Sequence, residues 1–218
     1  MIRRTTWLVS SVALVMACAN VVEEAPPAGT TPTEGVFGVA PPASRGTPSV
    51  VTLSPVSPPS ATDGTSGQGL NTQATGTAVM DQFGLAFTPR ELSVRVGEIV
   101  RFTNSEGALA HNVQLRSSAG GDELFNDDTS AGTFVEYEFA EEGGYDVTCE
   151  THPGMAAFIY ATTSPYVVFS TPDGAFHFPL VPPGEYTLSV WHVDESLRTD
   201  QAVAVGPEST EVRIRSSR

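Results

Sequence analysis

The sequence contains no lysine. It has eleven arginines and 25 acidic residues, which gives a formal charge of −14 over 218 residues. Binding to nucleic acid needs clustered positive charge to neutralise phosphates. This charge balance therefore excludes nucleic acid from the expected partners. The sequence also has no convincing amphipathic helix, because apolar residues do not recur with a period of 3.6 over a sustained stretch.

Cysteine is scarce as well, and Cys18 lies at the end of an N-terminal leader. The first residues, MIRRTTWLVSSVALVMAC, begin with two arginines and continue with an apolar run. This run is roughly ten residues long, whereas a bilayer span needs about 20. The pattern predicts a secretory signal peptide over residues 1–18. Its last residues, VMAC, resemble a bacterial lipobox, which implies that Cys18 becomes the lipid-attached first residue of the mature protein. An ordinary signal peptide with an incidental cysteine is the alternative.

A lipid on Cys18 would anchor the protein to the periplasmic or cell-surface side of a bacterial membrane. The outer membrane is favoured in a Gram-negative cell, because Ala19 does not resemble the aspartate that signals retention in the inner membrane. Lipidation would also leave Cys149 without a partner in the chain. An odd cysteine in an exported protein forms an intermolecular bond, stays reactive or binds a metal.

Residues 19–78 are rich in Pro, Ser, Thr and Gly and have few charges. The only charged residues within 25–78 are Glu34, Arg45 and Asp63. Such a composition does not bury enough apolar surface to offset the entropy of ordering the chain. We therefore expect a disordered tether over residues 19–78.

From residue 79 the pattern changes to short runs with a period of two, separated by Gly, Asn and Asp. The runs are GEIVRFTN, HNVQLR, FVEYEF, YDVTC and AAFIYA. This pattern is typical of an all-β sandwich or barrel.

The alternation also predicts which side chains face the interior. Tyr145, Val147 and Cys149 share one face of a strand, and His111, Val113 and Leu115 share one face of another. A thiol and an imidazole from separate strands should thus both point inward. His152 and Met155 follow Cys149 in the loop CETHPGM, which leads to the next strand.

Two histidines, a cysteine and a weak axial methionine form the ligand set of a blue-copper electron-transfer site. Each residue alone has a simpler interpretation, because an inward histidine is often a satisfied core residue and a buried cysteine often acts as a small hydrophobe. The combination favours a metal site. Zinc accepts similar nitrogen and sulfur ligands.

Residues 79–162 resemble the cupredoxins, the plastocyanin and azurin family, through FTPRELSVRVGEIVRFTN, HNV and YDVTCETHPGM. The Cys-x-x-His-x-x-Met spacing is most similar to amicyanin. The resemblance implies a Greek-key β-sandwich holding one type 1 copper, with ligands His111, Cys149, His152 and Met155. It further implies that Asn112 ties the two ligand loops together and that His152 is the electron port.

Residues 163–218 contain further period-two runs with DG and PPGE turns. PDGAFHF and VPPGEYTLSVWH resemble the C-terminal part of a carboxypeptidase regulatory-like, or transthyretin-like, β domain without its first strands. A segment this short is marginal for an independent core, so we expect it to pack on the cupredoxin. The alternation predicts that His177 faces solvent, that His192 is a hydrogen-bonded core or interface residue, and that Trp191 lies at the domain contact.

These observations predict an exported, lipid-anchored carrier of single electrons and not an enzyme. Ten carboxylates between Asp122 and Glu150 would attract a basic redox partner, such as a c-type cytochrome or an oxidase, or would simply aid solubility. Two other functions stay open. The first is copper storage or delivery, and the second is a surface binding module whose C-terminal β domain contacts a partner or glycan.

Overall fold

The computed structural model describes residues 32, 34–57 and 77–215. These residues form two β-sandwiches, and their only helix is a short 3₁₀ turn, η1 (Glu195–Leu197). The all-β prediction is confirmed. No helix among the described residues is long and apolar enough to cross a membrane.

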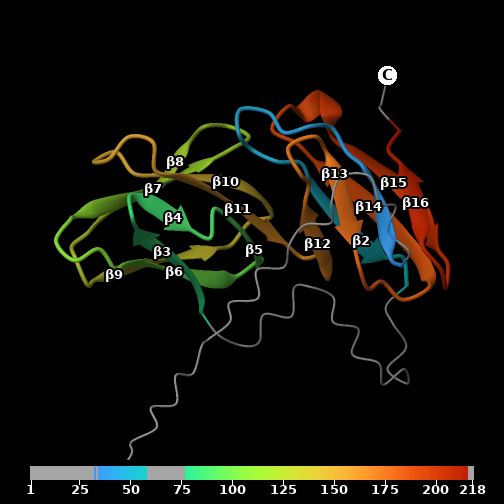
Figure 1. The fold of residues 1–218 in the computed structure, drawn as a ribbon, viewed down its shortest axis with the longest axis horizontal. Coiled ribbons are helices and arrows are strands. Elements are labelled where there is room, and N and C mark those ends of the chain that lie inside the picture. Colours follow the sequence, from blue (N-terminus) through green and yellow to red (C-terminus); the bar gives the residue numbers. More distant parts are fainter. Residues whose placement is uncertain (1–31, 33, 58–76, 216–218) are drawn as a thin grey trace, which may run out of the picture. The chain divides into compact units, whose positions relative to one another are not determined.

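The central sandwich contains the strands between residues 78 and 162, which are green to yellow in Figure 1. One sheet has the order β5-β11-β10-β7-β8, and the other has the order β4-β3-β6-β9. The bounds are β3 (Ala78–Phe83), β4 (Ala86–Thr88), β5 (Glu91–Arg95), β6 (Glu98–Asn104), β7 (His111–Ser117), β8 (Glu123–Thr129), β9 (Phe134–Phe139), β10 (Gly143–Thr148) and β11 (Ala156–Thr162).

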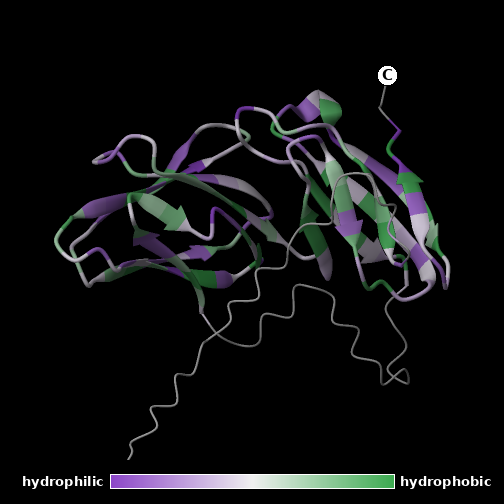
Figure 2. Cartoon of the chain, viewed as in Figure 1, coloured by the Kyte–Doolittle hydropathy of each residue, from purple (hydrophilic) through white to green (hydrophobic). Residues whose placement is uncertain are grey.

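The central core forms because the period-two runs place one apolar face of each sheet against the other. β6 alternates buried and less buried positions from Val100 to Asn104. Sixteen buried residues from both sheets make one cluster, which includes Cys149 and Met155. Bands of apolar and polar colour along the strands in Figure 2 show the same alternation. These two predicted ligands are thus part of the packed interior.

The flanking sandwich combines two strands that precede the central sandwich with five that follow it. Its sheets have the orders β13-β1-β16 and β12-β2-β14-β15. In Figure 1 the blue N-terminal segment lies among the orange and red strands. The bounds are β1 (Val36–Val39), β2 (Val50–Pro55), β12 (Tyr166–Phe169), β13 (Ala175–Phe178), β14 (Gly184–Trp191), β15 (Thr199–Val205) and β16 (Thr210–Arg213).

The prediction of a tether throughout residues 19–78 is therefore wrong for residues 36–55. β1 pairs with β13 and β16, and β2 pairs with β12 and β14, so each is an interior strand of its sheet. The first four residues of the run VVTLSP, 50–53, are buried, because the two faces of this strand pack against different parts of the protein. Val51 and Leu53 join the flanking core, while Val50 lies at the contact with the central sandwich. A strand buried on both faces has no alternation to reveal it.

The two sandwiches meet through aromatic side chains. Trp191 stacks on Phe158 with ring centroids 5.3 Å apart and lies 5.6 Å from the ring of Tyr160. A Cβ atom at Gly144 would lie 2.5 Å from the Trp191 ring, so only glycine permits this close approach. The expected packing of the C-terminal segment on the central sandwich is confirmed, and Trp191 lies at the contact as predicted.

Candidate metal centre

His111 is the first residue of β7, and its side chain is 1% exposed. It points into the central sandwich together with Val113 and Leu115, as the alternation predicts. Burial, and then the neighbouring His152, lower the pKa of His111 against a smaller opposing influence of Glu106. The imidazole is therefore neutral at pH 7, which is the form that binds a metal.

Cys149 directly follows β10 and opens the seven-residue loop that ends at Met155. The backbone N–H of Cys149 donates to the Met155 carbonyl at 3.2 Å, and the N–H of Met155 donates to the His152 carbonyl at 3.3 Å. Gly154 has a φ of 105°, a left-handed conformation that favours glycine, so Pro153-Gly154 forms the turn. The loop thereby places Cys149 and Met155 in the buried cluster and leaves His152 half-buried.

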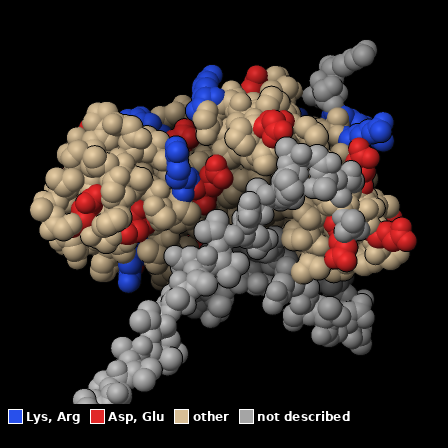
Figure 3. Space-filling view, in the orientation of Figure 1, with Lys and Arg blue, Asp and Glu red and all other residues tan. Residues whose placement is uncertain are grey.

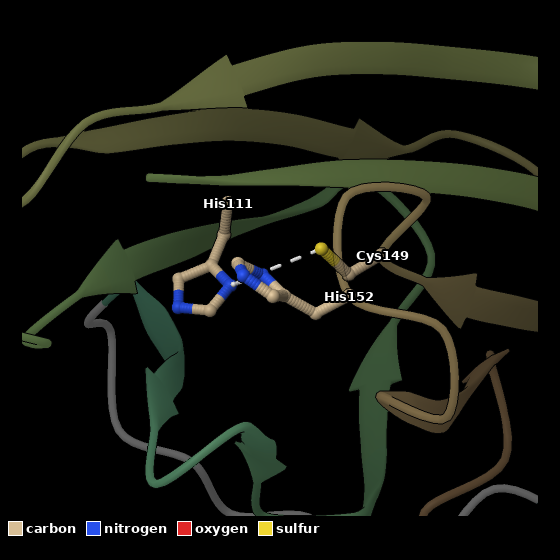
Figure 4. A group of neighbouring side chains, drawn as sticks. All are labelled: His111, Cys149 and His152. Atoms are coloured by element: carbon tan, nitrogen blue, oxygen red, sulfur yellow. Dashed lines mark hydrogen bonds between the residues drawn. The ribbon is translucent and has the colours of Figure 1, made fainter. Parts of the chain in front are cut away.

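Three donor atoms converge where this loop faces β7 (Figure 4). Nδ1 of His152 lies 3.0 Å from Nδ1 of His111, and Sγ of Cys149 lies 3.8 Å from the same His111 nitrogen. All three donor atoms lie within 4.8 Å of one another. Among the described residues this is the one such group of His, Cys, Asp and Glu, and Cys149 is a free, buried cysteine.

The two separations from His111 Nδ1, 3.0 Å to His152 Nδ1 and 3.8 Å to Cys149 Sγ, match those expected around a single thiophilic metal ion. Bonds of about 2.0 Å to nitrogen and about 2.3 Å to sulfur from one centre produce donor separations of about 3 to 4 Å. Two imidazole nitrogens and a sulfur that face one another concentrate lone pairs, and a single shared proton satisfies only part of them. A cation at their centre would neutralise this concentration of lone pairs in the buried site.

The side-chain oxygen of Asn112 connects β7 to the loop from Cys149 to Met155, which contains three of the predicted ligands and is called the ligand loop below. Oδ1 accepts the backbone N–H groups of Glu150 at 2.8 Å and Thr151 at 3.2 Å, and the Cys149 thiol donates to it at 3.3 Å. These bonds are shielded from solvent, since only 3% of Asn112 is exposed. Because the next residue in β7 is thus bonded to the Cys149 loop, His111 and Cys149 stay in register.

Two buried amides behind the site had not been predicted from the sequence. Nε2 of Gln82 donates to the Asn112 carbonyl at 3.0 Å, and its Oε1 accepts the Thr129 hydroxyl at 2.6 Å. Nδ2 of Asn104 donates to the carbonyls of Leu109 and Thr129 at 2.9 Å each. Both residues occupy inward positions of strands whose other inward positions are apolar, and this polar exception is the signal that could have identified them.

The other two histidines lie outside the centre. His192 is 1% exposed, and its Nε2 contacts the Pro42 carbonyl at 3.2 Å, which confirms a hydrogen-bonded core role. His177 lies between two buried phenylalanines on β13 and is half-buried, with Nε2 2.9 Å from the Glu34 carbonyl. The predicted lipid-attachment residue, Cys18, and the signal peptide lie outside the described residues.

Comparison with known proteins identifies the central sandwich. Residues 74–161 match the copper-binding proteins of the plastocyanin/azurin family. Plastocyanin from Ulva arasakii is 35% identical over 81 residues, which cover 34% of this chain and 82% of that protein, and plastocyanin from Ulva pertusa gives the same values. This chain belongs to the plastocyanin/azurin family. Its central sandwich is therefore a cupredoxin domain.

Solved structures similar to the chain include a point mutant of amicyanin in its reduced Cu(I) form at pH 4. It is 30% identical to this chain, and the match covers 40% of this chain and 84% of the amicyanin chain, with a TM-score of 0.36. A purple cupredoxin from Nitrosopumilus maritimus is 26% identical, and the match covers 38% of this chain and 98% of the purple cupredoxin, with a TM-score of 0.35. The family match ends at residue 161, so the resemblance of the following segment to carboxypeptidase regulatory-like domains stays a prediction.

Proposed function

We propose that this protein is an exported type 1 copper protein that carries single electrons between redox partners. The observation that carries the proposal is the convergence of His111 Nδ1, His152 Nδ1 and Cys149 Sγ within 4.8 Å in a cupredoxin domain. Met155 would be the weak axial ligand, because its backbone is bonded to that of Cys149 and its side chain is buried in the same cluster. One bound copper would supply one-electron redox chemistry.

The strands and the loop that carry the donor atoms would keep the positions of these atoms nearly constant when the bound copper is oxidised or reduced. His111 and Cys149 are held by adjacent strands, β7 and β10, whose registers are fixed by four residue pairs. Asn112 bonds the ligand loop to β7 a second time. A rigid donor set limits structural rearrangement on electron transfer and excludes water from the interior face. The same features favour a carrier over an enzyme, because the donor side chains are packed in the core and leave little room for a substrate.

His152 would be the point where electrons enter and leave. Its ring is half-buried, whereas that of His111 is almost completely buried. Exposed Pro153 and Gly154 follow His152 directly, and Leu109, which is 41% exposed, lies two residues before His111. These exposed, uncharged residues suit a brief contact with another redox protein.

The expected partner is a basic redox protein such as a c-type cytochrome or an oxidase. Four exposed carboxylates on or beside β8 support this proposal: Asp122, Glu123, Asp127 and Asp128. On the face shown in Figure 3, acidic and arginine side chains are scattered. Electron transfer to such a partner should slow with rising salt, because screening removes long-range attraction; a salt-independent rate would argue against the acidic surface.

Residues 1–18 support the proposal of a periplasmic or cell-surface protein with a lipid on Cys18. Fractionation of cells that produce Cys18→Ala tests this part independently of copper. The variant should leave the membrane fraction, and retention there would contradict the anchor.

The decisive experiment is a Cu(II) titration of the full chain purified without metal. We expect an intense visible thiolate-to-copper band and an EPR spectrum with narrow hyperfine splitting. Cys149→Ser should abolish both, while the matched control His177→Gln should retain them, because His177 lies in the flanking sandwich. A reversible one-electron wave in voltammetry would favour a carrier over a copper-delivery protein. A pale, ordinary Cu(II) spectrum would contradict the proposed site.

A further inference from the structure

The ligand loop is bonded to the central sandwich through a chain of polar side chains that extends beyond Asn112. Nδ2 of Asn112 donates to Oδ1 of Asn126 on β8 at 2.9 Å. Nδ2 of Asn126 donates in turn to Oε2 of Glu150 at 3.0 Å. Glu150 is the residue next to Cys149. This series of side chains therefore starts at Asn112 on β7, which accepts from the loop backbone, passes through β8, and returns to the loop one residue from the thiol.

The second carboxylate oxygen of Glu150 is bonded to β7. Nε2 of Gln114 donates to Oε1 of Glu150 at 2.8 Å and to Oε2 of Glu123 at 2.6 Å. Oε1 of Gln114 accepts the Thr148 hydroxyl at 3.1 Å. Glu150 therefore accepts one amide donor on each oxygen. A carboxylate accepts at both oxygens and donates at neither, whereas a glutamine would present an NH₂ group to one of the two amides.

The direction of every bond in this chain is determined by its two ends. At one end the backbone N–H groups of Glu150 and Thr151 only donate, so Asn112 must present its oxygen to them. At the other end the Glu150 carboxylate only accepts, so Asn126 must present its nitrogen to it. Asn126 then has its oxygen left for Asn112, which allows just one orientation of both amides.

We propose that Glu150, acting through Asn126, is a positioning residue for the metal centre: it orients Asn126, whose oxygen then accepts Nδ2 of Asn112 and secures the orientation in which Asn112 holds the Cys149 loop on β7. The inference rests on the proposed function for its meaning at copper, but the orientation of Asn112 is a property of the metal-free protein. Glu150 also places a negative charge one residue from the thiolate. An anion there favours the more positive, oxidised state of the site.

Two variants separate the bonding role from the charge. Asn126→Ala removes the bridge and keeps the Glu150 charge. Glu150→Gln removes the charge and turns one of the two acceptor positions into a donor. Glu138→Gln is the matched control, because Glu138 is exposed on β9, in the opposite sheet. Asn126 and Glu150 are both exposed, so these substitutions spare the core.

The first measurement is hydrogen exchange of the Asn112 side-chain amide by NMR in the full, metal-free chain. The amide should be protected in the wild type and in Glu138→Gln, and it should exchange at least several-fold faster in Asn126→Ala and Glu150→Gln. Equal exchange in all four proteins would overturn the proposal, whatever the outcome for copper.

The second measurement uses the copper-loaded protein. Copper loss to a chelator should be about tenfold faster in both network variants, which is the usual effect of removing a group that orients a metal ligand. The reduction potential should rise in Glu150→Gln and change less in Asn126→Ala and Glu138→Gln. Wild-type rates and potentials in both network variants would contradict the positioning role. Absence of a blue site in the wild type would instead overturn the proposed function, and the exchange result would still decide the orientation of Asn112.

Discussion

At the scale of single residues, the centre depends on side chains that would be costly to bury without partners. His111 is almost completely buried with a lowered pKa, and Cys149 is 3% exposed. One oxygen of Asn112 accepts from four donors of the ligand loop. The Cys149 thiol and the Asn112 oxygen are bonded to each other, and His111 Nδ1 faces His152, whereas the buried Nε2 of His111 has no hydrogen-bond partner among the described residues.

Met155 gives the residue-scale prediction. Met155→Leu keeps the volume and apolar character of the side chain, so the fold and the other three ligands should be retained. Loss of a weak thioether donor should destabilise the oxidised copper more than the reduced copper and raise the reduction potential. Cyclic voltammetry checks this, with Met80→Leu in the same core as the control. Equal potentials in both variants would show that Met155 is not an axial ligand.

At the scale of elements, hydrogen bonds in the segment before β7 help to place the start of that strand, His111. Nδ2 of Asn104 bonds the Leu109 carbonyl, and the carboxylate of Asp81 on β3 accepts the hydroxyls of Ser105 and of Thr103, the latter at 2.6 Å. Burial acts to raise the pKa of Asp81. The hydroxyl bonds, Ser105 first, together with backbone hydrogen bonds from Ser105 and Gln82 outweigh burial and lower the pKa below its ordinary value of 3.8. The ionised form of Asp81 therefore stabilises the folded state.

Asp81→Asn should accordingly lower the free energy of unfolding at pH 7 by about 1 kcal/mol, the usual scale for such hydrogen bonds. Because the pKa is lower in the folded protein, the stabilisation is fully present above the unfolded value near 3.8. It is lost as the pH falls below that value. Urea unfolding of both proteins at pH 7 and near pH 3 measures the difference. A gap between wild type and variant that stays constant with pH would contradict this role of the carboxylate.

At the scale of the whole molecule, the cupredoxin domain is inserted into a second sandwich. Residues 36–55 and 166–213 form one apolar cluster, although 110 residues of sequence separate Pro55 from Tyr166. β1 and β2 are interior strands of the two sheets, so neither sheet is continuous without them. The chain on both sides of the cupredoxin domain must therefore be present for the flanking sandwich to fold.

A fragment that begins at residue 58 tests this arrangement. Trp191 is the only tryptophan among the described residues and is 9% exposed, so its fluorescence reports on the contact between the sandwiches. Removal of β1 and β2 should shift its emission to longer wavelength and abolish cooperative unfolding of the flanking sandwich. A fragment that begins at residue 32 contains the same single tryptophan and should keep the emission of a buried Trp191 and cooperative unfolding. Identical emission and unfolding in the two fragments would contradict the inserted arrangement.

Features that depend on local order follow directly from the sequence. The period-two runs predict the strands of the cupredoxin domain, and their alternation correctly places His111 and Cys149 inward. The loop CETHPGM contains three of the expected ligands, so its spacing alone indicates the metal chemistry. These predictions succeed because strand periodicity and short loops are properties of neighbouring residues.

The pairing of segments that are distant in the sequence becomes visible in the folded protein alone. Val50 and Val51 lie in a proline-rich region of low charge, and their strand forms because β12 and β14 offer backbone partners and apolar cover on both faces. Likewise, Gln82, Asn126 and Glu150 reveal their roles only when β3, β8 and the ligand loop lie side by side. The direction of a hydrogen bond between side chains depends on partners far away in the sequence, and no local pattern records it.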